Sequence, residues 1–216
     1  MTALDFLSSL RQSRDPQLAG VAVGIVLDNL DATSQGRVQV QLPGLPIEPP
    51  WARVAAPDAG RDRGLYFMPQ VDDEVLVAFE HGDVTRPYVI GSLWNGTDRP
   101  PAVGPTDPRS KRVIRTPQGH VIELDDAKQT ITITGSTEQQ RVEITKDKIE
   151  LSAGSGASRL TLDTDGSVTL HASSTLTIEA QSLKLSATSI DIDAQGTAKL
   201  GASGVCTIQG SIVKVN

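Results

Sequence analysis

The chain has 216 residues and a formal net charge of −6, and its 7 aromatic residues and 13 prolines all lie within the first 117 positions. Large rings supply much of the buried area of a globular core, so the last 99 residues exclude a second compact domain of the usual kind. Residues 1–104 carry 8 arginines against 13 acidic residues, and neither half has the basic excess that phosphate neutralisation needs. Nucleic acid is therefore not an expected partner.

Residues 1–19 are expected to form an N-terminal arm that begins with a short amphipathic helix. Leu4, Leu7 and Leu10 recur at three-residue spacing within residues 2–11. A helix of this length is marginal alone, so the leucines need a partner, either the adjacent domain or another protein. The arm also lacks the basic region of a secretory signal. We expect synthesis in the cytoplasm without export by such a signal.

Residues 20–96 have the pattern of a small β-barrel. Apolar residues alternate with small or polar ones in five short segments separated by turn signals: 21–27, 38–42, 51–55, 74–80 and 86–94. Trp51 and Trp94 are large enough to fill the interior of such a barrel. As a nucleic-acid platform they would need basic neighbours, which they lack. Gly91 and Gly96 would permit backbone angles or close approaches that a side chain forbids.

Residues 97–117 are expected to be a linker, and residues 118–216 to be a repeat. Apolar pairs alternate with polar residues, and from Leu160 onward successive pairs begin 7 or 8 residues apart. This regularity is typical of stacked strands that cannot bury their apolar sides alone. The pairs are Ile122/Leu124, Ile131/Ile133, Val142/Ile144, Ile149/Leu151, Leu160/Leu162, Val168/Leu170, Leu176/Ile178, Leu183/Leu185, Ile190/Ile192, Ala198/Leu200, Cys206/Ile208 and Val213/Val215.

Two architectures accommodate twelve such units. One chain winding alone with three units per turn makes a stub of roughly 19 Å, at about 4.8 Å per stacked strand. Three interleaved chains, each contributing one strand per face in rotation, make about 12 layers and a rod of roughly 58 Å. The periodicity alone leaves both open.

The sequence offers no site for catalysis or for a cofactor. His81, His120 and His171 lie far apart, and the single cysteine, Cys206, has no partner for a disulfide or a metal cluster. The pairs Asp163/Asp165 and Asp191/Asp193 have the composition of a turn and of the outward positions of a strand. We therefore expect a protein that is not an enzyme and binds no cofactor or metal.

Several stretches resemble the family of VgrG and phage baseplate assembly protein V. They are 37–40, 51–55, 69–83 and 86–96, the last containing Gly-Ser-Leu-Trp-Asn-Gly, followed by 114–126. The signature positions are Trp51, Glu74, Gly91, Trp94, Asn95 and Gly96. Asp72 stands where relatives usually carry glycine, and aspartate tolerates the left-handed conformation better than most residues. The resemblance implies an all-β chain, with an N-terminal OB-fold barrel followed by a triple-stranded, intertwined trimeric β-helix.

The resemblance also implies a function. We expect a homotrimeric central spike, or baseplate hub component, of a contractile injection apparatus such as a phage tail, located in the tail baseplate and passing transiently through a target membrane. A small PAAR-repeat tip protein would cap Ile208, Ile212, Val213, Val215 and Asn216, which belong to a terminal segment without the His-x-His motif that binds iron in some relatives. Only about 19 residues precede the barrel, so a separate hub protein is expected, with Leu4, Leu7 and Leu10 as candidate contacts. The alternatives are a carbohydrate-binding β-helical tail fibre or adhesin, and a VgrG-like spike of type VI secretion.

Overall fold

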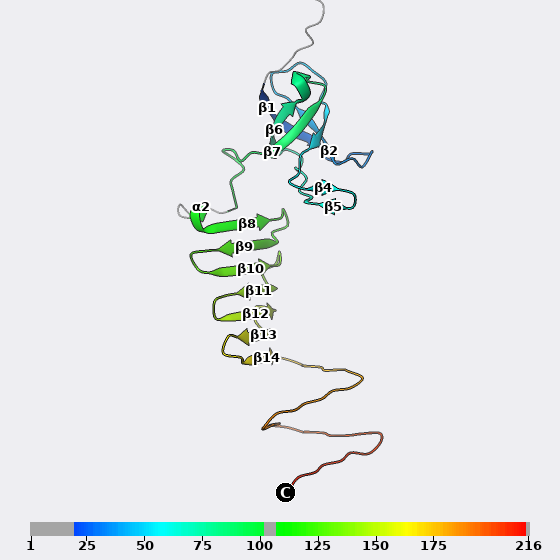
Figure 1. Cartoon of the computed structure of the whole chain (residues 1–216), viewed down its shortest axis with the longest axis vertical. Helices are drawn as coiled ribbons and strands as arrows, with labels where there is room; N and C mark the ends of the chain where they lie inside the picture. Colours follow the sequence, from blue (N-terminus) through cyan, green and yellow to red (C-terminus); the bar gives the residue numbers. More distant parts are fainter. Residues whose placement is uncertain (1–19, 102–106, 215–216) are drawn as a thin grey trace, which may run out of the picture. The chain divides into compact units, whose positions relative to one another are not determined.

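The computed structural model describes residues 20–101 and 107–214 (Figure 1). The chain divides at His171/Ala172 into two units, which are treated separately below. The expected helix at residues 2–11 lies outside the described residues. No helix in the described part of the chain is both long enough and apolar enough to span a membrane.

Five strands form a closed antiparallel barrel except for one parallel pair, β3 with β7, in the order β1-β2-β3-β7-β6. This confirms the barrel predicted for residues 20–96. Between β3 and β6 a small hairpin, β4–β5, projects from the barrel, and the 3₁₀ turn η1 connects β6 to β7. The bounds are β1 Val21–Asp28, β2 Arg37–Gln41, β3 Trp51–Val54, β4 Ala59–Gly60, β5 Arg63–Gly64, β6 Glu74–Phe79, η1 Glu80–Gly82 and β7 Pro87–Ser92.

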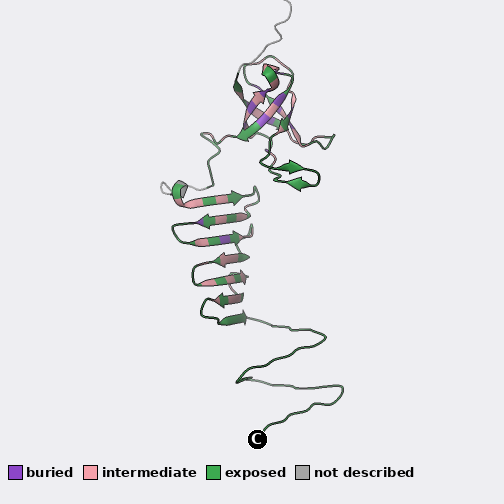
Figure 2. Ribbon diagram, viewed as in Figure 1, coloured by how far each residue is buried: buried purple, intermediate pink, exposed green. Residues whose placement is uncertain are grey.

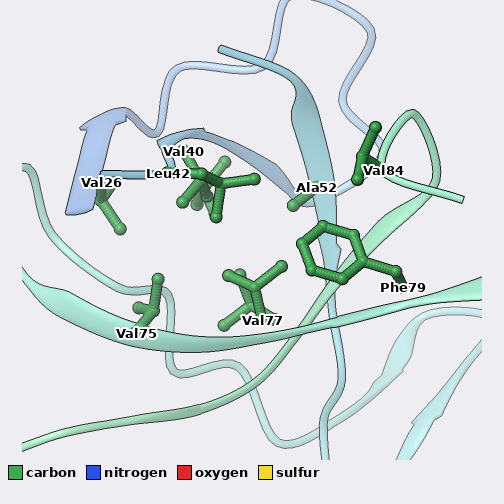
Figure 3. Packing of buried hydrophobic residues seen from close by; sticks show 10 residues of the cluster. Val26, Val40, Leu42, Ala52, Val75, Val77, Phe79 and Val84 are labelled. Carbon is green, nitrogen blue, oxygen red and sulfur yellow. The ribbon is translucent and has the colours of Figure 1, made fainter. Parts of the chain in front are cut away.

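The barrel interior is filled mainly by valines rather than by tryptophans (Figure 3). Its ten buried residues are Val26, Val38, Val40, Leu42, Ala52, Val75, Val77, Phe79, Val84 and Val89. The prediction that Trp51 and Trp94 fill the interior is therefore wrong. On β3 the inward residue is Ala52, whereas Trp51 is half-buried beneath the Arg37 guanidinium, 5.7 Å from the ring centroid. A five-stranded barrel is too narrow for indole rings once its strands supply valines.

Strand β1 directs its smaller residues inward. Gly24 and Val26 are buried, whereas the larger Val21, Val23 and Leu27 are exposed on the outside. A Cβ at Gly24 would collide with the Val40 side chain and lie 3.2 Å from the Gln41 carbonyl oxygen. The close approach of β2 to β1 thus selects which set of residues faces the core.

Two acidic residues shape the turns beside β1. Asp31 accepts hydrogen bonds from the Arg37 side chain at 2.9 and 3.0 Å, from the Thr33 hydroxyl and from the Gln35 amide, and so closes the β1–β2 loop. Asp72 adopts φ +74° in the turn before β6, and its amide donates to the Val26 carbonyl at 2.9 Å. The prediction that aspartate supports the left-handed conformation at position 72 is confirmed.

Seven strands in sequence order form one antiparallel sheet in the second part of the first unit (Figure 1). They are β8 Lys111–Arg115, β9 Val121–Asp125, β10 Thr130–Thr134, β11 Arg141–Ile144, β12 Lys148–Ala153, β13 Ser158–Asp163 and β14 Val168–Ala172, preceded by one helical turn, α2 Asp107–Ser110. Each expected apolar pair from Ile122/Leu124 to Val168/Leu170 falls on one of these strands. Consecutive strands of one chain are neighbours, so the rotating arrangement expected from residue 118 is not what residues 111–172 adopt.

Turn chemistry explains the antiparallel connections. Left-handed residues sit in the connections from β8 to β14, including Gln129, Glu138, Ser155 and Gly166, and side chains such as Asp125 accept amide hydrogen bonds within them. Such turns reverse the chain within a few residues. Strand β8 also lies inside the expected linker 97–117, because the turn at Gly119, with φ +90°, folds it back onto β9.

The second unit, Ala172–Asn216, is different in kind. Residues 173–214 contain no strand, and their apolar side chains are exposed (Figure 2). Gly166 is the last left-handed residue in the described part of the chain, so the tight reversals end with the sheet. The expected β-helix is therefore not formed by this segment within a single chain.

Candidate assembly surfaces

One face of the β8–β14 sheet carries two aligned rows of aliphatic side chains. In the first row, Ile114 pairs with Ile122, and the register continues through Ile133, Val142, Leu151 and Leu160. The second row runs Leu124, Ile131, Ile144, Ile149 and Leu162, with Arg112 opposite Leu124 at its start. These eleven aliphatic residues are called the apolar sheet face below.

The apolar sheet face is incompletely covered within one chain. Nine of its side chains remain 38–47% exposed. Complete burial of an aliphatic side chain stabilises by about 1.5–3 kcal/mol, so covering each of these residues would contribute roughly 0.6–1.2 kcal/mol more. A continuous exposed apolar surface of this kind is uncommon on a monomer and marks an interaction site.

The opposite face of the sheet is polar and internally paired. Lys148 Nζ lies 2.7 Å from Glu150 Oε2, Arg159 approaches the same carboxylate at 3.6 Å, and Arg141 contacts Glu143 at 2.7 Å. The hydrogen bond from Lys148 holds the pKa of Glu150 below its usual value and raises the pKa of Lys148. A face whose charges already satisfy one another is suited to contact with water.

The predicted tip contacts lie in the second unit. Ile208, Ile212 and Val213 are 67%, 76% and 55% exposed, respectively, whereas Val215 and Asn216 fall outside the described residues. The candidate hub contacts Leu4, Leu7 and Leu10 also fall outside them. The tip and hub assignments therefore remain predictions.

The signature positions gather at one end of the barrel's last strands, except Trp51 on β3. Glu74 begins β6, its carbonyl accepts from the Leu93 amide at 2.8 Å, and its carboxylate accepts from Asn95 Nδ2 at 3.3 Å. Asn95 Oδ1 in turn accepts from the amides of Thr97 and Asp98 at 2.8 and 2.7 Å. Asn-Gly is a local turn signal, but the contact between Asn95 and Glu74 joins residues 21 positions apart and has no local signal.

Two of the glycine assignments are not supported within the chain. Neither Gly91 nor Gly96 has a left-handed φ, and a Cβ built on either would meet no atom within 4 Å. Trp94, between them, is 69% exposed. The barrel by itself therefore gives no reason for glycine at these two positions.

The described residues hold no cluster of three or more His, Cys, Asp or Glu side chains placed to bind a metal ion. A hollow of about 360 Å³ lies between the β4–β5 hairpin and residues 65–68, with Tyr66 81% exposed beside it. Its lining includes Asp58 and Arg63, which pair with each other at 2.7 Å. The arrangement has no nucleophile and base in contact, so it offers surface for binding rather than for a reaction.

Comparison with known proteins places the barrel in a family. Residues 22–94 match the family described as the type VI secretion system/phage-baseplate injector OB domain. Over 92 residues, or 40% of the chain, it is 38% identical to two Pseudomonas aeruginosa proteins, the type VI secretion system spike proteins VgrG2a and VgrG2b. It is 29% identical over 111 residues, or 47% of the chain, to the actin cross-linking toxin VgrG1 of Vibrio cholerae. The matches span only 11%, 9% and 10% of these three relatives, and they confirm the resemblance to the VgrG and baseplate spike family.

Proposed function

We propose that this chain, whose residues 22–94 belong to the family of type VI secretion and phage-baseplate injector OB domains, is the homotrimeric central spike of a contractile injection apparatus, a phage tail or a phage-derived particle. The observation that carries the proposal is the apolar sheet face, which one chain leaves uncovered. Two further copies of the same face would cover it, because three sheets can enclose a common aliphatic interior. The role proposed is mechanical, with no catalytic step.

The trimer also accounts for the second unit. Its apolar pairs keep the spacing of seven or eight residues beyond β14, but it lacks the left-handed turns that would fold it back on its own chain. A strand that cannot pair within its chain can pair between chains, and interlocked chains leave few free edges. We propose that residues 172–216 form the intertwined β-helical part of the rod, beyond a prism built from three β8–β14 sheets.

A rod of this kind suits the piercing of a target envelope. Its strands are held between chains and must separate together, which gives kinetic resistance to unfolding under load. We propose that a separate hub protein holds the barrel end in the baseplate and that a PAAR-repeat tip protein caps residues 205–216. The exposed Ile208, Ile212 and Val213 are the apolar surface available to the tip protein.

A VgrG-like spike of a type VI secretion system is the second candidate, supported by the printed names of two relatives, the spike proteins VgrG2a and VgrG2b. A carbohydrate-binding tail fibre is less well supported. Sugar sites use aromatic platforms, and residues 95–216 contain no aromatic residue.

The location of the chain in particles tests the function. Particles purified from producing cells would be labelled with antibody against residues 111–171 and viewed by electron microscopy. We expect label at the baseplate end of the tail, and label along side fibres would instead support the fibre. Absence of the chain from particles, together with sheath-dependent appearance of it in the culture medium with tube protein, would support type VI secretion and contradict the phage assignment.

A further inference from the structure

A second apolar surface lies on the outside of the barrel, where β1, β6 and β7 pair side by side. Val21, Val23 and Leu27 are 53%, 45% and 39% exposed, and Ile90 is 48% exposed. Val21 pairs with Ala78 and Val23 with Leu76, while Leu76 pairs with Gly91 in turn. These residues, together with the half-buried Ile25, are called the β1–β6–β7 face.

Gly91 makes a hollow in this face. It lies in the row Val23–Leu76–Gly91, a Cβ there would meet nothing within 4 Å, and its φ requires no glycine. Glycine within a strand weakens it and often marks a place where another backbone approaches closely. No group in the described part of the chain occupies the space over Gly91, so the approaching backbone comes from elsewhere.

We propose that residues 2–11 of the same chain cover the β1–β6–β7 face, as a helix whose leucine side packs over Gly91. The chain outside the described residues joins the barrel at Gly20, directly beside Val21, the first exposed residue of the face. Gly20 has φ +110°, a conformation that lets the chain change direction as it enters β1.

The dimensions agree. A helix of ten residues is about 15 Å long, and the stretch of β1 from Val21 to Leu27 is roughly 20 Å long. Leu4, Leu7 and Leu10 lie on one side of such a helix. The connection of residues 12–19 spans up to about 28 Å, enough to bring the helix back along β1.

The tether favours this occupant over a separate protein. A short linker keeps the segment near the face at a local concentration in the millimolar range, whereas a separate partner loses translational and rotational freedom on binding. Of the two partners that the leucines leave open, the structure thus supplies the adjacent domain with a matching surface. The proposal does not depend on the trimer.

Disulfide capture tests it in the full-length chain with Cys206→Ser, which removes the single native thiol. Leu7→Cys with Val23→Cys is expected to oxidise within one chain, giving a link at the mass of the single chain under denaturing conditions. Leu7→Cys with Ala32→Cys is the matched control, because Ala32 is exposed but lies in the β1–β2 loop. Links at two or three times the chain mass would assign the face to another copy, and yields no higher than the control would assign it to a separate partner. Either result overturns the proposal.

Hydrogen exchange of residues 2–11 supplies a second reading without cysteines. Protection is expected in the native chain and should be lost in Gly91→Leu, which fills the hollow. Gly96→Leu is the matched control, because its surroundings are equally open and it lies outside the face. Equal protection in both variants would overturn the proposal. Light scattering on the same samples reports the oligomeric state separately, so a failure of the trimer is not mistaken for a failure of this contact.

Discussion

The two sides of the sheet can be compared by making the same substitution on each. Val142 on β11 lies in the apolar sheet face, paired with Ile133 and Leu151, whereas Val121 on β9 lies on the polar face, paired with Thr134. Both valines are half-buried in the single chain. Threonine keeps the branched shape and the strand propensity of valine, so each substitution changes little except one methyl group to a hydroxyl.

The expected effects differ because only Val142 becomes enclosed in the trimer. A buried hydroxyl without a partner costs about 1–3 kcal/mol, which amounts to at least about 3 kcal/mol over three copies. Assembly of three chains depends on the square of their concentration, so the concentration for half assembly should rise by about tenfold or more in Val142→Thr. In Val121→Thr the hydroxyl meets water, and the half-assembly concentration should stay close to that of the native chain.

The assay is the mass by light scattering after refolding over a series of chain concentrations, with circular dichroism confirming that both variants retain β-structure. Equal shifts in the two variants would refute the reasoning, because they would place both faces of the sheet in the same environment. A larger shift in Val121→Thr would place the interface on the wrong side of the sheet.

Three further outcomes are expected. Gly24→Ala should lower the free energy of unfolding by about 1–3 kcal/mol through overpacking, since its Cβ collides with Val40, whereas Gly96→Ala in open space should not; equal denaturation midpoints would contradict the packing. Asp31→Asn should destabilise the barrel at neutral pH: the hydrogen bond from Arg37 holds the pKa of Asp31 far below 3.8, so its contribution is present above pH 4 and is lost as the pH falls toward the folded-state pKa. The gap between native and variant stability should therefore shrink in acid, and a gap independent of pH would argue against the clamp. Deletion of residues 205–216 should abolish capture of the tip protein in pull-downs, and unchanged capture would remove that partner.

The sequence was sufficient for the elements but not for every direction in which they face. Short-period alternation located the barrel strands and every strand from β9 to β14, because each strand must present one side to a core. It could not show that β1 turns its smaller residues inward, since that depends on the approach of Val40 to Gly24, which lie on different strands. The role of the tryptophans was wrong for a related reason, as size alone does not reveal that Ala52 is the inward residue of β3.

The sheet shows a second limit. Spacing of the apolar pairs is the same on both sides of Ala172, yet one part folds back on itself and the other does not. The difference lies in the turns, where left-handed residues end at Gly166. Gly119 and Gly166 could have signalled hairpins, whereas Gln129, Glu138 and Ser155 are not residues in which a left-handed turn is expected. For the same reason strand β8 was placed in a linker.

The central claim is that three copies enclose the apolar sheet face, and the native mass of the full-length chain tests it most directly. Light scattering coupled to size-exclusion chromatography should give a mass near 69 kDa, three times the chain mass of 22.9 kDa. A species of 22.9 kDa that retains the sheet would contradict the claim, because the apolar sheet face would then be stable in water without a partner.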